Sequence, residues 1–299
     1  MIKRILYFGN PAYLKVKDNQ LVIDLPETKE TKTAAIEDIG VIVLDHPQIT
    51  ITHGTIARLL DNNTALITCD EKHLPTGYLL PLESHSLQSE RFRHQIEASE
   101  ALKKQLWQQT IQAKIKNQAE LLNQAGYSPK KMQQWVAEVK SGDEGNHEAV
   151  AAAHYWQRLF KSQIEFFYRD RYGEAPNHLL NYGYAILRGI VARGLVGSGL
   201  LPTLGIHHRN KYNAYCLADD IMEPYRPFVD KIVYDIVASG NLSDDMTREQ
   251  RALLLGMSVL DVKMEKKRSP LMVGLQSTTA SLAKCFTGES RKIIYPTFT

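Results

Sequence analysis

The stretch Pro75-Thr76-Gly77-Tyr78-Leu79-Leu80-Pro81 marks the place where the pattern of this sequence changes. Before it, short segments rich in β-branched and aromatic residues alternate with turn signals such as Asn10-Pro11, a pattern typical of β-strands. From residue 89 onward that pattern nearly vanishes, and long segments with apolar residues at helical spacing take its place. The sequence therefore predicts a strand-rich domain followed by a helical one, and a length of 299 residues suits two domains.

Residues 1–78 are the predicted β-rich domain. Its strands are expected at residues 4–8, 12–17, 20–24, 40–44 and 65–69, with a strand or turn at 33–39 and one short helix at 55–60. So many brief strands argue against a parallel sheet.

Residues 79–88 are the predicted linker, and residues 89–299 are the predicted helical domain. One long amphipathic helix is expected over residues 88–123, with Lys114 among the cations of its polar face. Further helices are expected at residues 130–140, 148–160, 176–198, 217–238, 247–255 and 269–285.

The composition is that of an ordinary globular protein, with 43% hydrophobic and 23% charged residues. A net charge of +3 is small, so any nucleic-acid surface has to come from the placement of cations. Cys69, Cys216 and Cys285 lie far apart and form no metal-binding or disulfide pattern, which fits a reducing cytoplasm. The chain has neither a signal-peptide pattern nor an apolar run of about 20 residues, so no contact with a membrane is expected.

Two histidines follow a glycine in the stretch Gly205-Ile206-His207-His208. A turn with positive φ costs least at glycine, so a tight turn is expected at Gly205. Because His207 and His208 are consecutive, they point in different directions, and one of the two is expected to reach a site. A surface or capping role is the plain alternative for either ring.

Three acids, Asp219, Asp220 and Glu223, occupy one turn of the next predicted helix. The apolar residues around them predict that much of this helix is buried, and a buried carboxylate needs a partner. Either Arg226 or a metal ion could supply it. The plain alternative is that the acids favour the positive end of the helix dipole.

Glu148 adds a third candidate ligand at the start of an upstream helix. The alanines that follow it have small side chains, so that another helix can approach this one closely. Two carboxylates and an imidazole, without a cysteine, favour a hard divalent metal such as magnesium or manganese, which serves to cut or rejoin phosphodiesters. An acid/base pair is the other interpretation of the same groups.

Together these motifs resemble the CRISPR-associated adaptation integrase, the universal CRISPR protein that inserts new spacers. The similarity covers essentially the whole chain and depends on several segments taken jointly. They are Ile39-Gly40-Val41-Ile42-Val43-Leu44-Asp45, Cys69-Asp70-Glu71-Lys72-His73-Leu74-Pro75, Glu148-Ala-x-Ala-Ala-x-x-Tyr155-Trp156, Asn181-Tyr182-Gly183-Tyr184, Gly199-Leu200-x-Pro202-x-x-Gly205-x-x-His208 and Asp220-x-x-Glu223-Pro224-x-Arg226-Pro227-x-x-Asp230. The short length and the residues around Glu223 are similar to members from type II CRISPR systems.

The resemblance implies an α+β protein, with a small N-terminal β-sandwich domain that dimerises and a larger all-α-helical catalytic domain. It implies a Mg²⁺ or Mn²⁺ ion held by the catalytic residues Glu148, His208 and Glu223. The family's Gly-x-x-His spacing selects His208 over its neighbour. Asp220 maps to a further acidic position, which is a candidate for supporting the site or binding a second metal.

The activity implied by the resemblance is that of a metal-dependent DNA integrase and endonuclease, which acts in defence against foreign DNA. The 3′-hydroxyl of a short duplex attacks a phosphodiester at the edge of a CRISPR repeat array. The implied partners are double-stranded DNA, a second copy of the chain, a small dimeric adaptation protein flanked by two integrase dimers, and accessory type II proteins. The implied location is the prokaryotic cytoplasm.

Cations of the helical domain are the candidates for contacts with DNA phosphates, because duplex binding gains mainly from the release of counterions. For each of them a solvated helix face is the plain alternative. The candidates are Arg209, Lys211, Arg248, Arg251, Lys263, Lys266, Lys267 and Arg268. The last four form a cluster and are the favoured set.

Two other functions fit the same residues. The first is a structure-selective nuclease for branched DNA, which shares the metal site but joins no ends. The second is a non-enzymatic DNA-binding scaffold, in which the acids and histidines are structural. Substitution of Glu148 or Glu223 by alanine distinguishes a scaffold from an enzyme. A scaffold would lose stability and keep its activity, whereas an enzyme would lose metal-dependent strand transfer.

Overall fold

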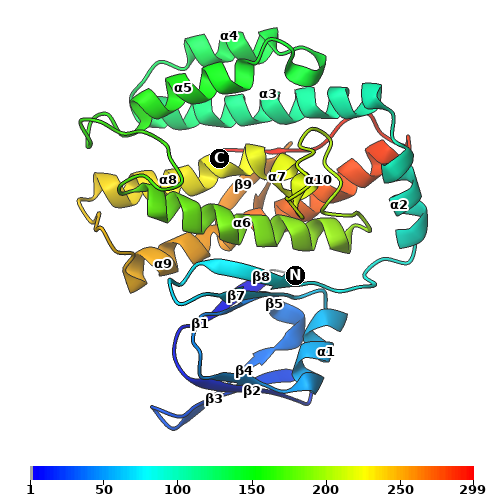
Figure 1. The fold of residues 1–299 in the computed structure, drawn as a ribbon, viewed down its shortest axis with the longest axis vertical. Coiled ribbons are helices and arrows are strands. Elements are labelled where there is room, and N and C mark those ends of the chain that lie inside the picture. The colour runs from blue at the N-terminus through cyan, green and yellow to red at the C-terminus, as the bar shows by residue number, and fades with distance from the viewer. Residues whose placement is uncertain (1–2) are drawn as a thin grey trace.

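The structure is a computed structural model that describes residues 3–299. Figure 1 shows a strand-rich part at one end of the molecule and a larger helical part at the other. The predicted fold class, α+β with an N-terminal β-sandwich followed by a larger helical part, is confirmed.

Two four-stranded sheets form the sandwich. One has the order β1 (Arg4–Phe8), β5 (Ile39–Leu44), β7 (Ala65–Cys69), β8 (Pro75–Leu79). The other has the order β4 (Glu30–Ala35), β3 (Gln20–Leu25), β2 (Ala12–Lys17), β6 (Ile49–Ile51). Apolar side chains from both sheets, such as Leu14, Leu21 and Ile42, form a core between them together with Leu59 of α1 (His53–Asp61).

The pairing of these strands differs from the expectation. β1, β5 and β7 run parallel, and so do β2 and β6, so both sheets are mixed. The prediction against parallel pairing is wrong, because the segment from β6 through α1 crosses over and returns β7 beside β5. The sequence pattern also missed β6 and β8, and the segment at residues 33–39 divides between β4, a turn of 3-10 helix and β5.

The helical part begins after residues 80–87, which contain no helix or strand. Its helices are α2 (Gln88–Glu97), α3 (Glu100–Gln124), α4 (Lys130–Glu138), α5 (His147–Leu159), α6 (Asn177–Gly197), α7 (Cys216–Met222), α8 (Arg226–Ala238), α9 (Arg248–Leu255) and α10 (Leu271–Phe286). None of the helices in residues 3–299 combines the length and the apolar character needed to cross a membrane.

Two predicted helices are interrupted. The helix expected over residues 88–123 is two helices, α2 and α3, because the chain turns at Ser99, whose side chain caps α3. The helix expected over residues 217–238 is divided into α7 and α8 by a turn of 3-10 helix at Glu223–Tyr225. Pro224 has no N–H with which to continue α7.

The C-terminal part is not entirely helical, contrary to the expectation. β9 (Asp261–Met264) and β10 (Lys267–Pro270) form a hairpin, and β11 (Pro296–Thr297) pairs with β9 on its other side. Val262 and Met264 are buried while the residues between and beside them are exposed, which is the alternation of a strand. The basic cluster at residues 263–268 therefore lies on a hairpin and not on a helix.

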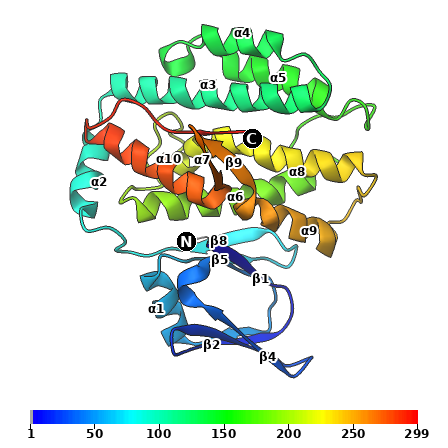
Figure 2. The same ribbon diagram turned by 180° about the vertical axis from the view of Figure 1, so that it is seen from behind.

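Helix α6 lies at the centre of the helical part and packs against the sandwich (Figure 1 and Figure 2). Gly189 lets it lie directly on the sheet, because a Cβ there would come within 2.8 Å of Ile67 on β7. The Tyr78 hydroxyl donates to the Ala185 carbonyl over 2.7 Å and holds α6 on β8. Helices α3, α4 and α5 form a layer on the side of α6 that faces away from the sandwich.

Candidate active site

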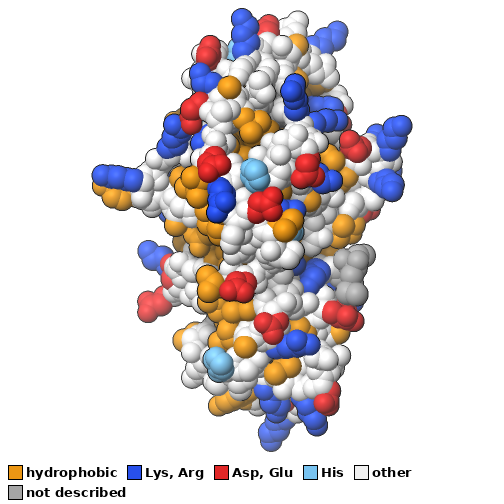
Figure 3. Space-filling model, turned by 90° about the vertical axis from the view of Figure 1, so that its right-hand side faces the viewer, with side chains coloured by type: hydrophobic (Ala, Val, Ile, Leu, Met, Phe, Trp, Pro, Cys, Tyr) orange, Lys and Arg blue, Asp and Glu red, His pale blue; other side chains and the backbone are white. Residues whose placement is uncertain are grey.

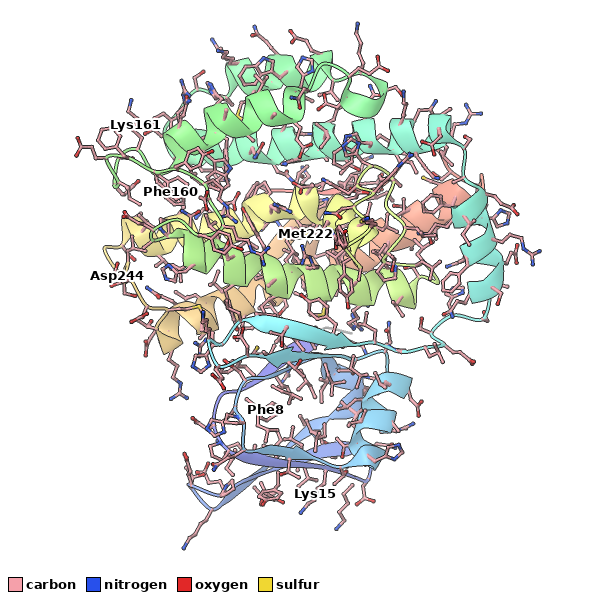
Figure 4. The ribbon with its side chains drawn as sticks, in the orientation of Figure 1. Phe8, Lys15, Phe160, Lys161, Met222 and Asp244 are labelled. Carbon is pink, nitrogen blue, oxygen red and sulfur yellow. The ribbon has the colours of Figure 1, made fainter. Side chains whose placement is uncertain are left out.

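Helix α3 presents a row of buried side chains to α5, α7 and the turn at Glu223–Tyr225. Trp107 and Lys114 belong to this row, since residues seven apart in a helix lie on the same face. Figure 4 shows Met222, the residue before Glu223, in the interior of the helical part. The candidate site therefore lies where α3 meets the junction of α7 and α8.

The ammonium group of Lys114 joins two of the predicted metal ligands. Its Nζ lies 2.7 Å from Oε1 of Glu148, to which it donates a hydrogen bond, and 2.6 Å from Oε2 of Glu223. Glu148 belongs to α5 and Glu223 to the turn after α7, so segments distant in sequence meet at one lysine. The prediction that Lys114 lies on an exposed polar face is wrong, because these segments cover it and supply its opposite charge.

Glu223 is buried and neutralised from two sides. Arg226 lies 3.0 Å from its Oε1, opposite the contact of Oε2 with Lys114. That second contact is not aligned as a hydrogen bond, so Oε2 lacks a hydrogen-bond partner within the described part of the chain. Burial alone would raise the pKa of Glu223, but Arg226 and Lys114 outweigh it and the pKa is lowered. Of the two partners expected for a buried acid of this helix, Arg226 or a metal ion, the structure shows Arg226 beside Glu223.

Asp220 is fully buried and holds residues 205–208, called the histidine loop below. Its carboxylate accepts the backbone N–H of His207 over 2.9 Å and that of His208 over 3.3 Å. It also bonds to Nδ1 of the His208 ring. This leaves Nε2 of His208 as the nitrogen for a ligand, the arrangement in which a carboxylate orients a metal-binding imidazole.

The two histidine rings have different surroundings. The ring of His207 stacks in parallel on Trp107, with centroids 4.1 Å apart, and burial lowers its pKa. The side chain of His208 is 45% exposed, and its hydrogen bond with Asp220 raises its pKa. His208 is therefore the better placed of the two to bind a ligand.

Gly205 has a role other than the expected one. The tight turn expected here does not use a positive φ, since Gly205 is not among the glycines with left-handed backbone. A Cβ at this position would clash with the carbonyl oxygen of His208 and lie 2.8 Å from Oδ2 of Asp220. A glycine is required because the histidine loop folds back tightly on α7.

The structure thus brings Glu148 and Glu223 together at Lys114 and places His208 near them. The negative charges of both acids contribute to the raised pKa of His208. Within residues 3–299, no three His, Cys, Asp or Glu side chains are close enough together to form a ready metal site. Two carboxylates and an imidazole nevertheless match the ligands of a hard divalent ion, and Oε2 of Glu223 accepts no hydrogen bond within the described residues. The three-residue metal site stays a prediction, since an ammonium lies between the two acids.

Lys114 is the residue of this site that the sequence pattern missed. A signal for it exists, because Ile111 and Ile115 flank it and Trp107 lies two turns earlier. A lysine within the apolar face of a helix, rather than beside it, indicates a buried charge with an acidic partner. The identity of that partner has no local signal, since both acids belong to other helices.

A buried hydrogen-bond network lies behind Glu223. Asp230 of α8 accepts a hydrogen bond from the Tyr155 hydroxyl over 2.8 Å and another from the Tyr184 hydroxyl. Arg226 packs over the Tyr184 ring and so connects this network to Glu223. Burial raises the pKa of Asp230 to about 6.

Two of the predicted DNA-contacting cations lie on the loop after His208. Arg209 forms an ion pair with Glu100 at the start of α3, and Lys211 lies over the ring of Tyr212. Figure 3 shows one face of the molecule, on which basic and acidic side chains are interspersed without a continuous basic area. Any contact with DNA on that face would depend on individual cations.

The other candidates lie on α9 and on the β9–β10 hairpin. Arg248 is exposed, whereas Arg251 lies at the junction with the sandwich. There it donates to the Tyr7 hydroxyl over 2.6 Å and lies 3.6 Å from the buried Asp45. Arg251 therefore differs from the exposed cation that was expected, because its guanidinium contacts Tyr7 and Asp45 within the protein. The exposed cations of the hairpin are Lys263, Lys266, Lys267 and Arg268.

Comparison with known proteins identifies the family. The model of the family CRISPR associated protein Cas1 matches residues 5–265. The chain belongs to the Cas1 family. This confirms the resemblance found in the motifs. Among its Cas1 relatives, the CRISPR-associated endonuclease Cas1 of Neisseria meningitidis serogroup C (strain 8013) is 35% identical over 294 residues, which cover 98% of this chain and 95% of that protein.

Solved structures agree with the fold of this Cas1 chain. A casposase bound to integration product matches with a TM-score of 0.80 at 22% identity, over 98% of this chain and 92% of its own. A chain of a Cas6-RT-Cas1–Cas2 complex matches with a TM-score of 0.74 at 19% identity, over 97% of this chain and 36% of that longer chain. At these identities the likeness supports the fold alone.

Proposed function

We propose that this Cas1 protein is a metal-dependent DNA integrase and endonuclease that inserts new spacers into the CRISPR array of a type II system. The observation that carries the proposal is the meeting of Glu148 and Glu223 at one cationic position near His208. The Neisseria meningitidis relative, which is named an endonuclease, adds support. The similar structure of a casposase bound to integration product is consistent with the integrase part of the proposal.

Glu148, Glu223 and Nε2 of His208 would hold the Mg²⁺ or Mn²⁺ ion. When bound, such an ion polarises a phosphodiester and stabilises the oxygen that leaves. Asp220 would fix the His208 ring with Nε2 toward the ion. Since both of its carboxylate oxygens are engaged by the histidine loop, Asp220 suits this supporting role better than that of a second metal ligand.

The reaction would be a transesterification. The 3′-oxygen of the incoming strand forms a bond to a phosphorus of the repeat strand, while the bond from that phosphorus to the repeat's own 3′-oxygen breaks. One proton leaves the attacking hydroxyl and one reaches the departing oxygen, so no side chain is covalently modified. Water in place of the 3′-hydroxyl would give nicking by the same groups.

The same proposal includes the partners of the protein. Residues 1–78 would form the dimer interface, residues 79–88 the linker and residues 89–299 the catalytic part that binds duplex DNA. Two such dimers would flank a small dimeric adaptation protein, with accessory type II proteins, and the Cas1–Cas2 complex among the similar structures supports this partner. The free cysteines Cys69, Cys216 and Cys285 support a reducing place of action such as the prokaryotic cytoplasm.

The test compares Glu148→Gln and Glu223→Gln with Glu144→Gln, whose exposed side chain pairs with Lys104 at the surface. Each protein is incubated with short duplexes and a supercoiled repeat plasmid, in Mn²⁺ or in EDTA. We expect the first two variants to lose strand transfer by at least about a hundredfold while they still fold and bind DNA, and the control to keep its activity. Unchanged joining in the first two variants would instead indicate a scaffold.

A duplex with a blocked 3′ end separates integration from nuclease activity alone. We expect free ends to be joined to the plasmid and blocked ends not to be. Equal joining of blocked ends would contradict the integrase proposal. So would the absence of any joined product from a protein that cuts branched DNA, which would indicate a structure-selective nuclease.

A further inference from the structure

Lys114 is the one buried lysine among residues 3–299. Both of its charged contacts are to acids of other segments, Glu148 on α5 and Glu223 after α7. At 2.7 and 2.6 Å, both distances are those of a direct ion pair between an ammonium and a carboxylate. The two carboxylates therefore share one cation that belongs to the protein itself.

These acids need a positive charge between them. Glu223 is buried, and Arg226 lies at its other oxygen, away from Glu148. Without Lys114, two negative charges would face each other in a poorly hydrated site, which is unfavourable. Lys114 therefore stabilises the contact of α3 with α5 and with the turn at Glu223–Tyr225.

We propose that Lys114 is a built-in counter-ion that competes with the divalent metal for Glu148 and Glu223. This inference rests on the proposed metal-dependent function. A metal ion binds carboxylate oxygens at about 2.0–2.2 Å, so an ion held by both acids would lie where the ammonium lies. Metal binding would have to break both ion pairs, and the flexible lysine stem lets the ammonium withdraw.

Lys114 would then determine the metal concentration at which the site becomes occupied. It keeps the two acids assembled in the absence of metal, and it weakens the apparent affinity because the metal must displace it. A neutral side chain of similar length at this position would give a site that is less stable without metal and that binds metal more tightly.

The test is a calorimetric titration of the metal-free full chain with Mn²⁺. Lys114→Met removes the charge and keeps the length, and Lys114→Arg keeps the charge. Lys104→Met is the matched control, since Lys104 lies exposed on the same helix and pairs with Glu144 at the surface. We expect the dissociation constant for Mn²⁺ to fall at least about tenfold in Lys114→Met and to stay near the parent value in the other two variants.

Thermal unfolding gives a readout that is independent of activity. In EDTA, Lys114→Met should unfold at a lower temperature than the parent, because its two acids repel each other. Addition of Mn²⁺ should raise its unfolding temperature by more than it raises that of the parent. If this variant does not fold in EDTA, Lys114→Gln, whose amide can still donate to a carboxylate, takes its place in both measurements.

Two outcomes would overturn the inference, and they differ in what they say of the proposed function. If the parent binds Mn²⁺, Glu223→Gln abolishes that binding and the neutral variants at residue 114 bind no more tightly, then the counter-ion role is wrong while the metal site stands. If neither the parent nor the neutral variants bind Mn²⁺, the metal-dependent function is wrong as well.

Discussion

At the level of single residues, the candidate site consists of charges that the fold has removed from water. Lys114 and Glu223 are buried in contact with each other, and Arg226 lies half-buried beside them. Each of these charges would be unfavourable alone, so removal of one leaves the others uncompensated. Asp230 differs, because its hydrogen-bond donors are the neutral hydroxyls of Tyr155 and Tyr184.

Asp230→Asn should change stability in a pH-dependent way. The folded-state pKa of Asp230 is raised to about 6 from an ordinary value of 3.8, so its ionised form destabilises the folded protein above pH 6. This penalty fades as the pH falls through 6 toward 4. Relative to the variant, the parent is therefore expected to gain about 1 kcal/mol of unfolding free energy between pH 7 and pH 5. Denaturant titrations at the two pH values measure this, and a pH-independent difference would contradict it.

At the level of secondary structure, α3 organises the site. One side of this helix carries Trp107 against a histidine ring, Lys114 between two acids and Asn117 against backbone carbonyls. Because α3 runs unbroken from its cap at Ser99, these three side chains keep a fixed spacing. The helix thus positions groups from the loop of His207, from α5, from the turn at Glu223–Tyr225 and from β11 relative to one another.

Asn117→Ala tests this organising role. The Asn117 amide donates to the carbonyls of Pro224 over 2.8 Å and Pro296 over 3.0 Å, and the substitution removes both of these buried hydrogen bonds. We expect the free energy of unfolding to fall by about 2–3 kcal/mol and strand transfer to weaken, because Pro224 follows Glu223. Asn123→Ala, at an exposed position of the same helix, is the control for both measurements. Similar losses in the two variants would argue against the role of Asn117.

At the scale of the whole molecule, the sandwich and the helical part share a packed junction. Helix α6 lies on the sheet of β1, β5, β7 and β8, and α9 adds a polar contact beside it. In that contact Arg251 bonds to Tyr7 and lies near Asp45, which is buried at the end of β5. The buried acid and its arginine couple the two parts of the chain.

Arg251→Met should therefore destabilise the protein, whereas Arg248→Met, one turn earlier and exposed, should not. Without Arg251, Asp45 keeps its contacts with the Tyr7 hydroxyl and the His73 ring but loses its arginine. We expect the free energy of unfolding to fall by about 1.5–3 kcal/mol. For Arg248→Met a change within about 0.5 kcal/mol is expected. Chemical denaturation of both variants checks this, and equal stability of the two would show that the junction does not depend on Arg251.

The regular elements of this Cas1 chain were largely predictable from local pattern. Strands β1, β2 and β7 occupy the predicted residues, and α4, α5, α6, α9 and α10 begin and end within a few residues of the predicted bounds. The features that were missed are the short strands, such as β6 and β8, and the two helix breaks, which depend on the Ser99 cap and on Pro224. The motifs also sufficed for the family, since their residue types and spacings are fixed along the chain.

Contacts between distant segments decided the rest. The parallel pairing of β5 with β7, the use of Arg251 at the junction and the position of Lys114 between Glu148 and Glu223 all join residues far apart in sequence. A charge can be buried only where folding delivers an opposite charge to it. Which opposite charge lies beside a buried one depends on how the helices pack, and a pattern of neighbouring residues in the sequence does not predict that packing.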